Sequence, residues 1–425
     1  MSVRENVLQP EGLPRIESRA LHPAMGRVLV LLGLSVVINY IDRSNLSIAA
    51  PLIKDEMGIT ASQLGTLLSA FFWTYSFMQI VSGWLVDRFD VKWVFALGFL
   101  LWSAATAVTG ILHGFVALLI VRVVLGIGEA VSFPSYGKIV CGYFDERRRG
   151  FANAIVISGL ALGPALGMLV GGSVVSRFGW RLFFVVVGLA GLVWLLPWLA
   201  WMPRRDATSS SASSPLSGML AVIRRRQAWA MWICHFSLAY PLYFLLTWLP
   251  YYLTRARGMS LNQMARAGAL IFLIYAGASA ATGKLADRWI ATGATPSLVR
   301  KGLSVVGCIC VAIFLCAAVA VQDRTLCVWM LVLTGASMGI LGTNLYSAAQ
   351  TLAGQHMVGR WTGLQQCMGN LSGVVAPAVT GWLLDRTGHF HWPFYLAAIV
   401  SALGGLSWLF LVGPVETIDW GTELS

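Results

Sequence analysis

Charged residues are scarce in this sequence. Only 11% of its 425 residues are Asp, Glu, Lys or Arg, whereas 57% are hydrophobic and the mean hydropathy is +0.73. A soluble globular domain carries about 25% charged residues, so the composition excludes that class. The short alternating segments of a transmembrane β-barrel are also missing, and long apolar runs stand in their place. The sequence therefore predicts an all-α membrane protein.

The motifs that mark enzymes and ATP-driven proteins are missing as well. No phosphate-binding Gly-Lys-Ser loop occurs, and GIGEAV at 126–131 lacks the third glycine of a dinucleotide-binding loop. His389 and His391 have no further metal ligands at suitable spacing, and no Ser-His-Asp or Cys-His arrangement has supporting context. The seven cysteines lie in or beside apolar runs without disulfide or zinc spacing. We therefore expect no enzyme, no cofactor and no metal site.

Twelve apolar runs are each long enough to cross the roughly 30 Å hydrocarbon core of a bilayer. We expect them to form two six-helix halves, with transmembrane helices at approximately 27–50, 62–86, 93–112, 115–141, 150–176, 180–202, 228–253, 264–287, 301–321, 325–353, 361–384 and 392–414. The first run is too long for a signal-peptide core and has no evident cleavage site after it, so we interpret it as an uncleaved span.

The net charge of +12 follows the predicted topology. With twelve spans both termini share one side, and the tails and loops of that side carry eighteen Lys and Arg residues against eight on the other. The positive-inside rule then predicts cytoplasmic termini and a multi-pass protein of the cell (inner) membrane, with the bilayer and not nucleic acid as its basic partner. The segment 254–266, with three arginines, is a local exception.

The longest interruption divides the chain into two halves that resemble each other. We expect a cytoplasmic tail at 1–26, a six-helix bundle at 27–202, a cytoplasmic linker at 203–227, a second bundle at 228–414 and a cytoplasmic tail at 415–425. GWLVDR at 83–88 recurs as GKLADR at 283–288, and GGSVVSRFGWRLFF at 171–184 recurs as GWLLDRTGHFHWPF at 381–394. Parallel repeats around a midplane site are typical of secondary transporters.

Small residues recur at intervals of four in the fifth and eleventh predicted spans. They are Gly159, Gly163, Gly167 and Gly171 in one, and Gly369, Gly373, Pro377 and Gly381 in the other. Such a spacing makes a flat helix face, so we expect another helix to pack closely against each.

The motif GWLVDRFDVK lies at the cytoplasmic end of the second predicted span. Asp87 and Arg88 there, and Asp287 and Arg288 in the second copy, are predicted to pair with neighbouring helix ends and to latch one conformation. The alternative is a solvated helix end that only follows the positive-inside rule. The motif resembles the loop 2–3 signature of the major facilitator superfamily, with Asp90 where glycine is usual.

More specific segments extend this resemblance. YIDRSNLSIAAP (40–51), RVVLGIGEAVSFPS (122–135) and TGLQQCMGNLSG (362–373) resemble the anion:cation symporter family, and within it the proton-coupled sugar-acid transporters of galactonate and glucarate type. The resemblance covers essentially all twelve predicted helices and implies alternating access around a central site.

Four ionisable residues lie within two predicted spans of the N-terminal half: Asp42, Arg43, Arg122 and Glu129. Each costs about 2.5–3.5 kcal/mol at the bilayer centre. Arg122 and Glu129 are seven residues apart on one helix face, too far for a direct pair, so crosswise pairing between the two spans is the economical arrangement. Protonating an acid would then free its arginine for an anionic substrate. The alternative is a static ion network that only fixes helix packing.

The resemblance implies a role for each of these positions. It implies that Asp42 and Glu129 are protonatable acids, and that Arg43 and Arg122 bind a carboxylate or hold the acids. It further implies a binding-cavity tyrosine at Tyr75 and a polar amide at Gln366. Leu160 departs from the family pattern, because galactonate-type members have glutamine there, and one hydroxyl-recognising group is lost.

The C-terminal half contrasts with this charged half. Its predicted span interiors carry almost no ionisable residue, but several tyrosines and amides. These neutral donors and aromatic faces suit the hydroxyls and C–H faces of a polyol or ring. We expect Asn344 and Gln366 to face a cavity, although interhelical hydrogen bonding is the alternative for each.

Together these features predict a secondary transporter that imports a small organic anion, a sugar acid by resemblance, with protons and as a monomer. Aromatic or other small carboxylates, anion exchange and uniport remain alternatives. A transporter-like sensor is less favoured, because the central loop and tail are short.

Overall fold

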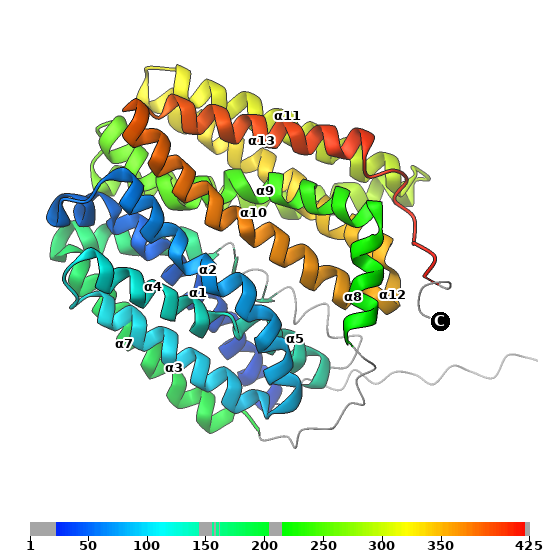
Figure 1. The fold of residues 1–425 in the computed structure, drawn as a ribbon, viewed down its shortest axis with the longest axis horizontal. Helices are drawn as coiled ribbons and strands as arrows, with labels where there is room; N and C mark the ends of the chain where they lie inside the picture. The colour runs from blue at the N-terminus through cyan, green and yellow to red at the C-terminus, as the bar shows by residue number, and fades with distance from the viewer. Residues whose placement is uncertain (1–22, 144–154, 157–158, 161, 204–214, 421–425) are drawn as a thin grey trace, which may run out of the picture.

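A computed structural model describes residues 23–143, 155–156, 159–160, 162–203 and 215–420, and every element in this part is a helix (Figure 1). In chain order they are α1 (Pro23–Met57), α2 (Ala61–Arg88), α3 (Val91–Thr109), α4 (Phe115–Glu129), α5 (Ser132–Tyr143), the π-helix η1 (Gly167–Gly171), α7 (Gly172–Trp201), α8 (Pro215–Arg224), α9 (Arg226–Tyr251), the π-helix η2 (Tyr252–Ala256), α10 (Leu261–Ala291), α11 (Pro296–Ala320), α12 (Arg324–Thr387) and α13 (His391–Phe410).

Eleven helical stretches in the described part are long and apolar enough to cross a membrane. One of them, Leu162–Trp201, has 40 residues and is divided at Gly179, whose φ of 82° is open to glycine but strained for other residues. It therefore contains two of the predicted spans. The eleven stretches thus correspond to the twelve spans that the sequence predicts. A second glycine, Gly354 with φ 64°, divides α12 in the same way. The all-α membrane fold is thus confirmed.

The helices form two bundles that lie side by side. Figure 1 shows α1–α5 and α7 in one bundle and α9–α13 in the other, with α8 and the C-terminal segment at the end of the second. In α8, Ala221 and Val222 are buried in the same apolar cluster as Trp361 and Trp420. The Trp420 indole donates to the carbonyl of Ala353, so the C-terminal segment is held against this bundle.

Helix starts repeat between the halves at the same offset as the sequence motifs. Thr60 caps α2 in a capping box with Gln63. Two hundred residues further along the chain, Ser260 caps α10 in a capping box with Gln263. In both boxes the hydroxyl accepts from the backbone N–H of the glutamine, whose side chain accepts from the capping residue. This identical local chemistry supports the predicted duplication.

The two faces of small residues lie where the sequence predicts close helix contact. A Cβ on Gly163 would come within 2.3 Å of the Tyr40 side chain, and one on Gly167 within 2.4 Å of Ser44, so α1 packs directly on the glycine face. In α12, a Cβ on Gly373 would lie 2.5 Å from the Phe72 ring, and the carbonyl of Pro377 lies against Gly65. The glycine face that contains Gly163 and Gly167 therefore packs against α1, and the face of α12 packs against α2.

Candidate functional site

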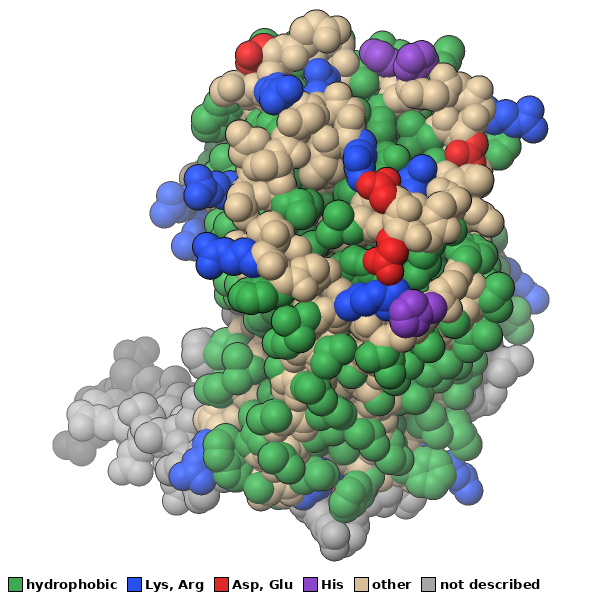
Figure 2. All heavy atoms as spheres, turned by 90° about the vertical axis from the view of Figure 1, so that its left-hand side faces the viewer, with side chains coloured by type: hydrophobic (Ala, Val, Ile, Leu, Met, Phe, Trp, Pro, Cys, Tyr) green, Lys and Arg blue, Asp and Glu red, His purple; other side chains and the backbone are tan. Residues whose placement is uncertain are grey.

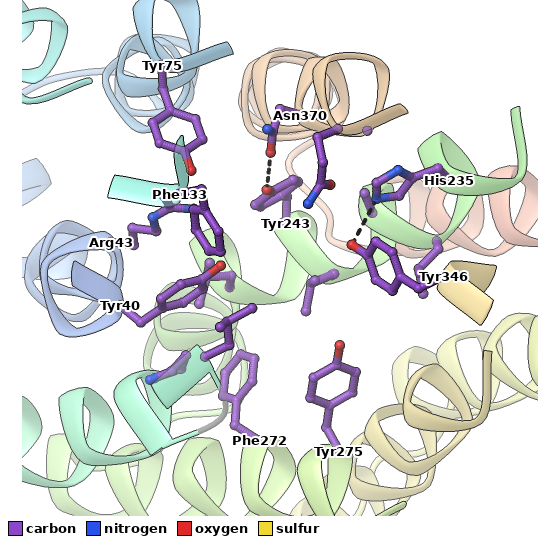
Figure 3. A pocket seen from close by; sticks show the side chains of 18 of the residues that line it. Tyr40, Arg43, Tyr75, Phe133, His235, Tyr243, Phe272, Tyr275, Tyr346 and Asn370 are labelled. Atoms are coloured by element: carbon purple, nitrogen blue, oxygen red, sulfur yellow. Dashed lines mark hydrogen bonds between the residues drawn. The ribbon is translucent and has the colours of Figure 1, made fainter. Parts of the chain in front are cut away.

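A cavity of about 170 Å³ lies between the two bundles and is lined by both (Figure 3). That volume equals roughly six water molecules at liquid density, so it suits a small solute. Apolar and aromatic side chains, including Phe133, Leu160 and Phe272, make up part of the wall. The polar side chains that line it are Tyr40, Arg43, Tyr75 and Gln79 from the first half and His235, Tyr243, Tyr275, Tyr346, Gln366 and Asn370 from the second.

Arg43 provides the cationic side of this cavity. Its Nε donates to Glu129 Oε2 at 3.1 Å, and both side chains are almost fully buried. The guanidinium carbon lies 4.7 Å from the Tyr40 ring centroid and 4.3 Å from that of Tyr75, within cation–π range. Arg43 Nη2 and Glu129 Oε1 have no hydrogen-bond partner. The site therefore holds a fixed cation whose Nη2 is free to donate.

The second half of the crosswise arrangement is not formed. Asp42 accepts a hydrogen bond from Asn45 at 3.0 Å, and no ion pair joins it to Arg122 in the part of the chain that the structure describes. Arg122 is buried with its Nε unpaired, and its guanidinium lies 5.4 Å from the Phe71 ring, which Arg43 approaches at 5.3 Å. Asn45 lies one helical turn from Asp42 on the same helix, α1, so the hydrogen bond that Asp42 accepts is local. Neither Asp42 nor Arg122 lines the cavity.

Of the predicted substrate-binding residues, three line the cavity, whereas Arg122 and Asn344 do not. Tyr75 and Gln366 line the cavity, as does Leu160. Asn344 does not: it is buried in α12 and its amide donates to the carbonyl of Ile340 at 2.8 Å. In this conformation Asn344 therefore does not face the cavity as expected, and its amide uses a backbone carbonyl one helical turn away.

The C-terminal half also contributes an ionisable group to the cavity wall, although the sequence predicts almost none in its span interiors. His235 of α9 is 4% exposed and lines the cavity, with Tyr346 of α12 beside it (Figure 3). Sequence reasoning also missed Tyr40, Gln79 and Tyr275. An imidazole inside the apolar run ICHFSLAY was the available signal for His235, since intramembrane ionisable residues are rare.

Polar contacts between the two halves gather at the end of the molecule opposite the C-terminal segment. Asp385 of α12 accepts from the backbone N–H groups of Ala61 and Ser62, which begin α2, at 2.9 and 2.7 Å. Arg255 pairs with Asp55 of α1. Figure 2 shows this end face, where acidic and basic side chains lie next to one another among apolar ones. These contacts close the bundle at this end.

Two arginines of the exceptional basic segment make contacts of different kinds near this end. Arg255 pairs across the halves, whereas Arg257 donates to the carbonyls of Ala318 and Val321 at the end of α11, each at 2.7 Å. Cations suit the unsatisfied carbonyls of a helix C-terminus. Their positive charge therefore serves local contacts.

The predicted latch residues lie at the other end. Arg88 is exposed, with its guanidinium 5.9 Å from the Trp84 ring, and Asp287 and Arg288 are exposed as well. The side chain of Asp87 lies outside the described residues. Within the described part, no ion pair holds Arg88, Asp287 or Arg288 in this conformation.

Comparison with known proteins identifies the family. The sequence matches the profile of the Major Facilitator Superfamily over residues 32–377. The chain belongs to this superfamily. It is a secondary transporter and a multi-pass membrane protein, and members of this family are not enzymes.

Curated relatives of this superfamily member are named for organic anions. It is 32% identical over 410 residues to a probable sulfoacetate transporter of Cupriavidus necator, covering 92% of this chain and 94% of the relative. It is 28% identical to a hexuronate transporter of Bacillus subtilis (93% and 96% covered) and 28% identical to a D-galactonate transporter of Escherichia coli (92% and 96% covered). The predicted resemblance to sugar-acid transporters is confirmed at this level.

The fold is shared with a solved transporter. A bacterial homologue of the human lysosomal transporter Spinster, in an inward-facing and occupied conformation, matches with a TM-score of 0.80 at 19% identity, covering 92% of this chain and 97% of that one. At this identity the likeness extends to the fold alone.

Proposed function

We propose that the protein imports a small organic anion, a sugar acid such as a hexonate or hexarate, together with protons. The observation that carries the proposal is the buried ion pair between Glu129 and Arg43, of which Arg43 lines the cavity. A substrate carboxylate and Glu129 compete for one guanidinium. Protonating Glu129 releases Arg43 to the substrate, and binding of the anion favours the protonated acid, so the two ligands are coupled.

Asp42 supplies a second protonatable carboxylate in this proposal. It is buried beside Arg43 on α1 and interacts electrostatically with both Glu129 and Arg122. A proton on one acid changes the field at the other. Arg122 interacts electrostatically with both acids but forms an ion pair with neither in the described part of the chain, so it can stabilise whichever acid is ionised. Tyr75 and Gln366 then contact the rest of the substrate from the two halves.

The orientation of the chain completes the cycle. The excess of Lys and Arg on the side of the termini supports cytoplasmic termini. The closed end at Asp385 and Arg255 then faces outward, and the Asp87/Arg88 and Asp287/Arg288 motifs lie at the cytoplasmic end. We propose that these motifs pair with neighbouring helices when the cytoplasmic end closes, so that the two ends alternate. Residues of both halves of the chain line the cavity, and we expect a monomer to suffice.

A second candidate substrate class is a small aromatic carboxylate. Phe133, Leu160 and Phe272 on the cavity wall favour it, because they offer apolar contact, and galactonate-type transporters are expected to have a glutamine at the position of Leu160. Aromatic rings stack favourably on such side chains. Both candidates place their carboxylate at Arg43.

Reconstituted protein tests the proposal. Liposomes with an anion gradient directed inward should take up protons, and the lumen should acidify in step with uptake of the anion. The double variant Asp42→Asn, Glu129→Gln should lose this coupling. Wild-type coupling in the double variant would refute the mechanism. An uptake rate that a protonophore does not change would indicate an exchanger or uniporter. Ligand binding without transport would indicate a sensor.

A further inference from the structure

His235 occupies the side of the cavity opposite Arg43. Figure 3 shows the two side chains facing the same space from the two halves, with Tyr346 next to His235. The imidazole is 4% exposed and packs against Gly369, where a Cβ would come within 2.6 Å of the ring. Because the glycine face of α12 holds the ring so closely, the direction of its nitrogens is fixed.

The backbone sets the tautomer of this imidazole. His235 Nδ1 lies 2.9 Å from the carbonyl oxygen of Gln365. A carbonyl only accepts hydrogen bonds, so Nδ1 carries the hydrogen and Nε2 of the neutral ring is an acceptor. The orienting partner belongs to α12, whose neighbouring residues Gln366 and Gly369 also line the cavity.

His235 Nε2 accepts only a long, weak hydrogen bond. Its partner is the Tyr346 hydroxyl at 3.4 Å, longer than the 2.7–3.2 Å of a typical protein hydrogen bond. A hydroxyl group that bridges the two atoms from the cavity side would donate to His235 Nε2 and accept from Tyr346, replacing one long bond with two ordinary ones. An anionic group would meet the lone pair of Nε2 and be repelled. His235 and Tyr346 together are therefore suited to bind a hydroxyl group.

We propose that His235, with Tyr346, recognises a hydroxyl of the transported anion at the end away from its carboxylate. The inference rests on the proposed function, because it concerns the other end of the same substrate. It assigns hydroxyl recognition to the C-terminal half, whereas Leu160 on the wall contributed by the N-terminal half cannot hydrogen-bond. The substrate is thus a hydroxylated anion with its charge at Arg43 and a hydroxyl at His235.

Two matched pairs of probes test this assignment. D-galactonate is compared with 6-deoxy-D-galactonate, and 4-hydroxyphenylacetate with phenylacetate, by binding to the purified full-length protein. The wild type should bind the hydroxylated member of at least one pair about 10-fold or more tightly, since an unmatched buried acceptor is costly. His235→Leu should reduce that ratio to about one while the deoxy member still binds.

Further variants keep the test valid if His235→Leu does not fold. Tyr346→Phe keeps the ring and removes the hydroxyl, and should lower the same ratio. Gly369→Ala should displace the imidazole, whereas Gly363→Ala, with nothing within 4 Å of the added Cβ, should leave the ratio unchanged. Tyr240→Phe, a buried phenol of α9 that does not line the cavity, is the second control.

The outcomes separate this inference from the proposed function. Equal binding within both pairs, still dependent on Arg43, would overturn the role of His235 alone. A wild-type ratio in His235→Leu, or in both Tyr346→Phe and Gly369→Ala, would do the same. No binding of any of the four anions would overturn both.

Discussion

Arg43 Nε lies 3.1 Å from Glu129 Oε2, and this ion pair joins α1 to the end of α4 at the wall of the central cavity. Both partners are buried, yet each retains one atom without a hydrogen bond. A buried pair that serves stability alone is commonly matched by apolar packing. The incomplete pairing suits a site that exchanges partners during transport.

Glu129→Gln should uncouple transport from protons. An amide cannot be protonated near neutral pH, so uptake driven by external acidification should fall by roughly 10-fold or more, whereas exchange of anion for anion should persist. The measurement is uptake into proteoliposomes at external pH 5–8, where the wild type should accelerate as pH falls. Glu416→Gln, the same change at an exposed position, is the control. A variant that still accelerates at low pH would contradict the role of Glu129.

Arg43→Lys should weaken substrate binding even though the charge remains. The planar guanidinium stacks between Tyr40 and Tyr75 and bonds Glu129 through Nε, and an ammonium cannot reproduce that geometry. We expect KM for the transported anion to rise by about 10-fold or more. Arg266→Lys, at an exposed position of α10, should not change KM. An unchanged KM in Arg43→Lys would show that the anion binds elsewhere.

Leu160→Gln should shift substrate preference toward more highly hydroxylated acids. The side chain lines the cavity, so an amide there adds a donor and an acceptor that a hydroxyl can use. In competition uptake assays, the ratio of inhibition by D-galactonate to inhibition by phenylacetate should increase about 5-fold or more, since one hydrogen bond contributes about 1 kcal/mol. Leu162→Gln, at an exposed position two residues away, is the comparison. A constant ratio would show that position 160 does not contact the cargo.

Asp385→Asn should favour opening of the end that is closed here. The carboxylate caps α2 from the other half of the molecule, so its loss removes a contact that exists only in the closed arrangement. The expected shift is about 1 kcal/mol, the typical strength of a helix N-cap. Spin labels at the exposed positions Arg177 and Arg266 should report a larger fraction of long distances.

Asp323 offers a matched control for this change. It caps α12, the helix that it precedes, through the backbone N–H of Leu326, so Asp323→Asn removes a cap without removing a contact between the halves. Its distance distribution should match the wild type. Equal distributions in both variants would show that Asp385 does not stabilise the closed end.

Gly126→Ala should destabilise the protein and disturb the ion pair. A Cβ there would lie 2.3 Å from the carbonyl oxygen of Phe71, so α4 must move away from α2. We expect a loss of about 1–3 kcal/mol in the free energy of unfolding, as in other overpacked contacts. Gly137→Ala, with nothing within 4 Å, should be close to neutral in the same thermal unfolding measurement. Similar stability of both variants would contradict the close contact of α4 with α2.

The sequence by itself determined the membrane fold, the spans and the duplicated halves. An apolar run within the bilayer has to form its backbone hydrogen bonds internally, so it has to be a helix. Small residues at intervals of four predict close helix packing, as at Gly163 and Gly373. The embedded charges were also visible, because an ionisable residue in an apolar run is rare enough to stand out.

Only the tertiary structure decided which of these side chains share the cavity. It brought Arg43 to Glu129 but left Asp42 with Asn45, and it turned Asn344 toward the carbonyl of Ile340. Such choices depend on helix rotation and on competing partners a few ångströms away, which spacing along one helix does not specify. His235 and Tyr346 come from different helices, α9 and α12. Their pairing at the wall of the cavity is a product of the packing of the two helices.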